Sequence, residues 1–120
     1  MKFTYISEIL QDKRFKSILN DSIEEETHRR NNRLVVYESH GLKLRRNVFI
    51  HLDEHGLMNI GFLVGEFNLI EEGKSNLSAN ERHFIHLIVD EAIMKTIEYY
   101  KNSPLQRVKK MFNNMFCKTN

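Results

Sequence analysis

The segment from Leu42 to Leu52 alternates apolar and polar residues, and this pattern constrains the fold more than any other in the chain. The apolar positions are Leu42, Leu44, Val48, Ile50 and Leu52. Because successive side chains of a strand point to opposite faces, these residues would line one face of a sheet. Arg46 falls on the same face and predicts a bulge or a strand rim. The segment therefore predicts a half-buried strand.

Two further segments predict strands on either side of this one. Residues 33–38 are β-branched and aromatic, and apolar residues alternate again from Met58 towards Ile70. Between the segments lie two similar phrases that end in Gly41 and Gly56, and glycine can adopt the positive φ of a tight turn. Short turns of this kind join antiparallel neighbours, so we predict a three-stranded antiparallel meander.

Helices are predicted on both sides of the meander. Helical spacing of apolar residues runs from Thr4 to Leu19, and Asn20-Asp21 is expected to end that helix. The polar stretch at 22–32 is expected to be an exposed helical turn or loop. Ser78 and Glu81 have the form of a capping box and predict the longest helix at 79–101. Its apolar arc comprises Ile85, Ile88, Val89, Ala92, Ile93 and Thr96.

The Ser103-Pro104 pair predicts a second C-terminal helix immediately afterwards, because serine is a good N-cap and proline fits the first helical position. The predicted fold class is thus α+β. We expect a single domain over residues 1–120, with an N-terminal helix, the meander, and two C-terminal helices packed on one sheet face. A length of 120 residues suits one such domain.

Composition favours a cytoplasmic protein. The single cysteine, Cys117, cannot form an internal disulfide, which suits a reducing compartment. No apolar run is long enough to cross a bilayer, so no membrane is expected among the partners. Four of the 18 basic side chains and none of the 16 acidic ones lie in residues 104–120. That segment therefore carries +4 and the remainder of the chain −2.

Motifs for catalysis are missing from the sequence. It contains no nucleophile elbow and no phosphate-binding glycine loop, and Cys117 lies three residues from the C-terminus. We therefore expect a non-enzyme without a cofactor. His83, His86 and Asp90 fall within about 60° of one another on the 79–101 helix and are the candidate metal ligands. An ordinary boundary between apolar and polar faces is the favoured interpretation of this trio.

An amphipathic, basic helix is expected at residues 104–120. Its apolar stripe consists of Leu105, Val108, Met111, Phe112, Met115 and Phe116. The simplest interpretation is that this stripe packs on the domain's own sheet. The functional interpretation is that it enters a groove of a larger protein partner. A homodimer through this helix or through an open sheet edge is a further alternative.

Two functions from different classes follow. The leading hypothesis is a small non-catalytic protein-binding module: an inhibitor, immunity-type or regulatory protein that acts on a larger protein partner. The alternative is a nucleic-acid-binding protein whose basic residues contact phosphates. Those residues are Lys43, Arg45, Arg46, Arg107, Lys109 and Lys110.

Overall fold

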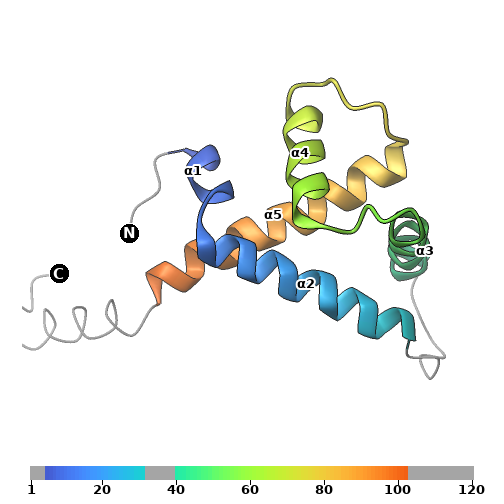
Figure 1. Cartoon of the computed structure of the whole chain (residues 1–120), viewed down its shortest axis with the longest axis horizontal. Coiled ribbons are helices and arrows are strands. Elements are labelled where there is room, and N and C mark those ends of the chain that lie inside the picture. The colour runs from blue at the N-terminus through green and yellow to red at the C-terminus, as the bar shows by residue number, and fades with distance from the viewer. Residues whose placement is uncertain (1–4, 32–39, 103–120) are drawn as a thin grey trace, which may run out of the picture.

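A computed structural model describes residues 5–31 and 40–102, and every regular element in these ranges is a helix. The elements are α1 (Ile6–Leu10), α2 (Lys13–Asn31), α3 (His40–Glu54), α4 (Ile60–Glu71) and α5 (Ala79–Lys101). Helix α5 runs through the middle of the arrangement and contacts each of the other four (Figure 1). The predicted α+β fold is therefore wrong, since two of the three expected strands form α3 and α4. The third, at 33–38, lies outside the described residues.

The predicted strands at 42–52 and 58–70 are helical because their apolar residues also recur at helical spacing. In α3 the inward positions are Arg45, Val48, Phe49 and Leu52, and in α4 they are Ile60, Leu63, Val64 and Phe67. Both sets follow the i, i+3, i+4, i+7 pattern of an amphipathic helix. Short apolar runs satisfy alternation and helical spacing together, so the pattern alone does not separate the two structures. The adjacent residues Val48 and Phe49 both pack in the core, whereas a half-buried strand would place them on opposite faces.

The glycine expected in the second hairpin turn ends a helix instead. Gly56 has a φ of 70°, as its proposed turn role requires, but it follows α3. The Leu57 N–H donates to the Leu52 carbonyl at 2.9 Å, and the Gly56 N–H donates to the Asp53 carbonyl at 3.0 Å. This pair of bonds is the Schellman motif, which satisfies the last carbonyls of a helix. Gly73, with a φ of 73°, ends α4 in the same way.

The predicted N-terminal helix is divided in two by Asp12. One carboxylate oxygen of Asp12 accepts hydrogen bonds from the backbone N–H groups of Arg14 at 2.9 Å and Phe15 at 3.2 Å, so that α2 begins at Lys13. The helix then continues to Asn31, so the helix end predicted at Asn20-Asp21 is wrong. The exposed helical turn or loop expected at 22–32 is, over residues 22–31, part of this long helix. Ser22 and Glu26 are buried within this part of α2, and the Glu26 carboxylate accepts a hydrogen bond from Arg45 of α3.

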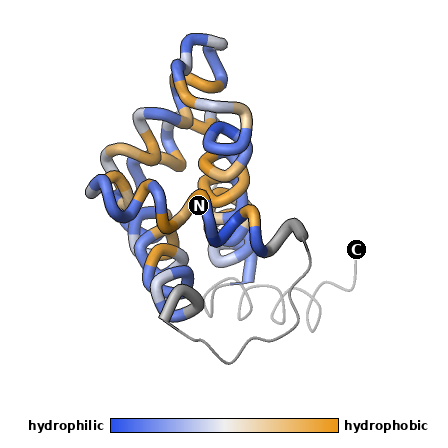
Figure 2. The backbone as a smooth tube through the Cα atoms, turned by 90° about the vertical axis from the view of Figure 1, so that its right-hand side faces the viewer, coloured by the Kyte–Doolittle hydropathy of each residue, from blue (hydrophilic) through white to orange (hydrophobic). Residues whose placement is uncertain are grey.

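Helix α5 has the predicted bounds. The Ser78 Oγ accepts from the Glu81 N–H at 3.3 Å, and a Glu81 carboxylate oxygen accepts from the Ser78 N–H at 3.1 Å, which confirms the capping box. Every residue of the predicted apolar arc is buried. These residues join Phe15, Leu19, Phe49, Leu63 and others in one core cluster. In Figure 2, hydrophobic and hydrophilic stretches alternate along the helices, as expected for elements with one buried side.

Candidate partner-binding surface

The side of α5 that faces away from the core carries two large apolar residues. Met94 is 58% exposed and Ile97 is 41% exposed. At about 100° per residue, both lie on the side of the helix opposite the fully buried Ala92. Two residues three positions apart form a continuous ridge on a helix surface. We call Met94 and Ile97 the outer strip.

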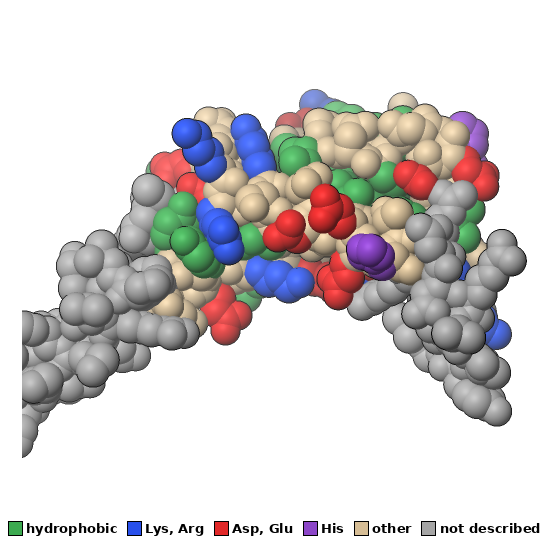
Figure 3. All heavy atoms as spheres, turned by 60° about the horizontal axis from the view of Figure 1, so that its bottom comes forward, with side chains coloured by type: hydrophobic (Ala, Val, Ile, Leu, Met, Phe, Trp, Pro, Cys, Tyr) green, Lys and Arg blue, Asp and Glu red, His purple; other side chains and the backbone are tan. Residues whose placement is uncertain are grey.

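Further exposed apolar residues lie on α1, which contacts α5. Tyr5 precedes α1, and Ile6 is its first residue; both are exposed. On the face drawn in Figure 3, a group of hydrophobic side chains lies among Lys and Arg side chains, and acidic side chains gather next to them. Apolar surface bordered by charge is typical of protein-binding sites.

A polar joint holds the C-terminal part of α5 against the start of α2. The Tyr100 hydroxyl donates to the Asp12 carboxylate, with distances of 2.9 and 3.0 Å to its two oxygens. The Arg14 guanidinium lies 4.1 Å from the centre of the Tyr99 ring, within the range of a cation–π contact. Desolvation, followed by the hydrogen bond to Asp12 and its negative charge, raises the pKa of Tyr100 above the usual 10.0. The C-terminal part of α5, which carries the outer strip, is therefore held against the start of α2.

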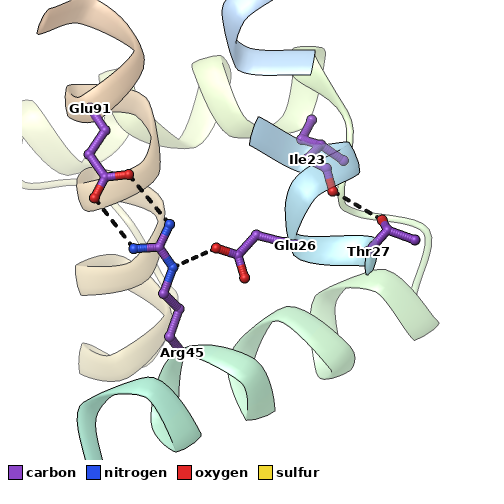
Figure 4. Close-up of polar contacts among 5 residues, drawn as sticks. All are labelled: Ile23, Glu26, Thr27, Arg45 and Glu91. Carbon is purple, nitrogen blue, oxygen red and sulfur yellow. Dashed lines mark hydrogen bonds and ion pairs between the residues drawn. The ribbon is translucent and has the colours of Figure 1, made fainter. Parts of the chain in front are cut away.

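Arg45 connects three helices from the inside (Figure 4). Its Nε donates to Glu26 Oε1 of α2 at 2.7 Å, and its two terminal nitrogens donate to the carboxylate oxygens of Glu91 of α5, each at 3.4 Å. Burial lowers the pKa of Arg45, but the hydrogen bonds and negative charges of Glu91 and Glu26 outweigh this effect and raise the pKa above its usual value. The guanidinium also faces the Phe84 ring at 6.0 Å. All three of its nitrogens therefore contact carboxylates within the protein.

The basic residues of the nucleic-acid alternative are not gathered on one surface of α3. A strand would have placed Lys43 and Arg45 on the same face, whereas a helix separates them by about 200°. Lys43 is exposed, Arg46 is half-buried, and Arg45 points inward to the two carboxylates. Arg107, Lys109 and Lys110 lie outside the described residues. Binding of nucleic acid stays a prediction, although α3 offers no concentrated phosphate-binding face.

The candidate metal ligands all lie on the exposed part of α5. His86 Nε2 is 2.9 Å from Glu71 Oε1 of α4, and its ring stacks on Phe67 at 5.4 Å between centroids. His83 and Asp90 are exposed. Within residues 5–31 and 40–102, no group of three or more His, Cys, Asp or Glu side chains is arranged to hold a metal ion. His86 contributes to the α4–α5 contact instead.

The apolar stripe at 104–120 lies outside the part of the chain that the structure describes. Its predicted partner-binding residues are Leu105, Val108, Met111, Phe112, Met115 and Phe116, and they stay predictions. The outer strip was missed by sequence reasoning, which considered only the main apolar arc of α5. The available signal was the presence of Met94 and Ile97 off that arc, at positions where a solvated helix face usually carries polar residues.

Comparison of the chain with protein-family models, with curated proteins and with solved structures finds no match in any of the three. Among the five helices described, none combines the length and the apolar character needed to cross a bilayer.

Proposed function

We propose that this chain is a small non-catalytic protein-binding module: an inhibitor, immunity-type or regulatory protein that acts on a larger protein partner in the cytoplasm. The observation that supports the proposal is the outer strip, where Met94 is 58% exposed and Ile97 is 41% exposed on the longest helix. Exposed apolar ridges on an ordered helix favour docking into a hydrophobic groove. The unbranched Met94 side chain can adapt to an irregular partner surface.

The charge distribution supports a particular kind of partner surface. Residues 104–120 carry +4, and their predicted apolar stripe would supply a second binding element next to the end of α5. A partner with an apolar groove and an acidic rim would complement both elements. Complementary rim charge mainly accelerates association and selects the partner, while the apolar centre supplies most of the affinity.

The test is capture of a partner by the tagged full-length protein from an extract of the native host, with and without nuclease. A double variant, Met94→Glu with Ile97→Glu, places two charges in the outer strip. Lys95→Glu, at an exposed position of the same helix, changes the net charge by the same two units and serves as the matched control. We expect one protein, captured in stoichiometric amount after nuclease, to be lost with the double variant and retained with the control.

Far-ultraviolet circular dichroism on both variants shows whether the helices remain intact, as expected for substitutions at exposed positions. Equal capture by both variants would contradict the assignment of the outer strip. Capture that disappears with nuclease and is released by moderate salt would overturn the proposal and favour nucleic-acid binding.

A further inference from the structure

We infer that two copies of the chain associate through the outer strip in the free protein, with their α5 helices side by side and antiparallel. The two-fold axis passes between Lys95 and Thr96. This inference goes beyond the proposed function, because it concerns the purified chain without any larger partner. A larger partner that binds the outer strip would compete with the second copy.

The residues that carry the inference form one row on the exposed side of α5. Asp90, Met94, Ile97 and Lys101 are all exposed and fall within an arc of about 60°. Their spacing of four, three and four residues is that of the a and d positions in a two-stranded coiled coil. The row lies on the side of the helix opposite the buried Ala92, so a second helix can approach it without displacing the described core.

The row is symmetric about its midpoint, as a two-fold interface requires, because each copy contributes the same surface. Met94 and Ile97 are equally far from the midpoint, so Met94 of one copy is level with Ile97 of the other. Asp90 and Lys101 are also equally far from it, so each carboxylate is level with an ammonium group of the other copy. Each pair occurs twice. The interface therefore has an apolar centre with an ion pair at each end.

The two charges select this arrangement over the alternatives. A parallel pair of α5 helices would place Asp90 beside Asp90 and Lys101 beside Lys101, and like charges repel. An antiparallel pair shifted by four residues in one direction would place Asp90 opposite Ile97. The same shift in the other direction would place Lys101 opposite Met94. Among the described residues, no hydrogen bond or ion pair involves the side chain of Asp90 or Lys101, so both side chains are available to a second copy.

The row extends only about 17 Å along α5, so we expect a weak, reversible dimer. Sedimentation equilibrium of the full-length protein measures it over a concentration series from micromolar to millimolar. A reducing buffer excludes a disulfide between the Cys117 residues of two chains. We expect a monomer–dimer equilibrium without larger species, because a two-fold interface closes on itself. Met94→Glu combined with Ile97→Glu should remain monomeric, and a wild-type protein that is monomeric across the series would overturn the inference.

Exchange of the two charges tests the register. Asp90→Lys places two lysines opposite each other at both ends of the interface, and we expect the Kd of the dimer to rise about tenfold. Lys101→Glu should raise it by a similar factor, because two acids then face each other. The two substitutions combined restore opposite charges at each end and should return the Kd to near the wild-type value. Lys95→Glu, at least about 100° from every residue of the row, is the control and should leave the Kd unchanged.

Distances between spin labels test the antiparallel orientation independently. Cys117→Ser removes the only native thiol, and Lys95→Cys or Asn80→Cys then provides a single exposed site for a nitroxide. Position 95 lies next to the two-fold axis, so double electron–electron resonance should give a distance under about 25 Å between the two copies. Position 80 lies near the far end of α5, so its two labels should be about 45 Å apart.

Short distances at both positions would indicate a parallel pair and would overturn the inference. A combined charge variant that dimerises no better than either single variant would overturn it as well. Far-ultraviolet circular dichroism on each variant reports whether its helices remain intact. None of these samples contains a larger partner, so loss of the dimer and loss of partner capture are separate results.

Discussion

Replacement of Arg45 by methionine should lower the free energy of unfolding by about 3 kcal/mol. The Glu26 side chain is only 5% exposed, and the variant removes the guanidinium nitrogen that lies 2.7 Å from its carboxylate. Removal of one partner from a buried ion pair costs about 3–5 kcal/mol, because the remaining charge keeps its desolvation penalty. We take the lower end of that range because Arg45 itself is 20% exposed and water reaches part of the site.

A second variant separates loss of charge compensation from loss of packing. Combining Arg45→Met with Glu26→Gln removes both charges, and we expect the double variant to recover about half of the lost stability. Glu91→Gln alone should cost less than about 1 kcal/mol. Glu91 receives two of the hydrogen bonds, but each is 3.4 Å long and its side chain is 39% exposed.

Urea denaturation followed by far-ultraviolet circular dichroism measures these differences, with unchanged m-values as the check that the unfolding reaction is the same. A loss of 3 kcal/mol corresponds to a decrease in Tm of roughly 10 °C. A stability of Arg45→Met within about 1 kcal/mol of the wild type, or a double variant no more stable than the single one, would refute a buried, charge-compensated Glu26.

Three further changes test other contacts by the same measurement. Asp12→Ala removes the N-cap of α2 and the acceptor of the Tyr100 hydroxyl, and should cost about 1–2 kcal/mol, more than Tyr100→Phe. Gly56→Ala should also cost about 1–2 kcal/mol, because the φ of 70° disfavours residues with a Cβ. The added methyl group meets no atom within 4 Å, so an unchanged stability would refute this backbone effect. Ser78→Ala should cost about 1 kcal/mol at neutral pH. The hydrogen bond from the Ser78 side chain lowers the pKa of Glu81 below 4.5. The part of the difference that depends on ionised Glu81 is therefore fully present above about pH 4.5 and is lost as the pH falls through the lowered value, while the part from the bond between the Glu81 N–H and Ser78 Oγ remains. A constant difference between wild type and variant from pH 7 to pH 3 would contradict this.

Helix α5 was predictable because several local signals agree on it. Its capping box is complete within four residues, Ser78 to Glu81, and its apolar arc extends over many turns. The β-branched and aromatic residues of α3 also suit a strand. Arg45 of α3 binds the carboxylates of Glu26 and Glu91, which are separated from it in the sequence by 19 and 46 positions. Periodicity in a short segment contains no information about such distant carboxylates.

The candidate surface was predictable only in part. The amphipathic pattern of residues 104–120 can be read from the sequence, because period and charge are both strong there. The outer strip depends on which side of α5 the other helices leave uncovered. This side cannot be identified when α3 and α4 are expected to form a sheet. With the helices in place, Met94 and Ile97 are exposed aliphatic residues of α5 on the side away from the core.

The central position of α5 has a consequence for synthesis of the protein. Helices α1 to α4 leave the ribosome first, but each of them packs against α5, whose buried residues extend from Phe84 to Thr96. The nascent chain therefore lacks most of its core until nearly the last of the described residues has been translated. Until then its apolar side chains are accessible to chaperones and proteases, and a stable N-terminal intermediate is not expected. Folding should be a single late event that follows the emergence of α5.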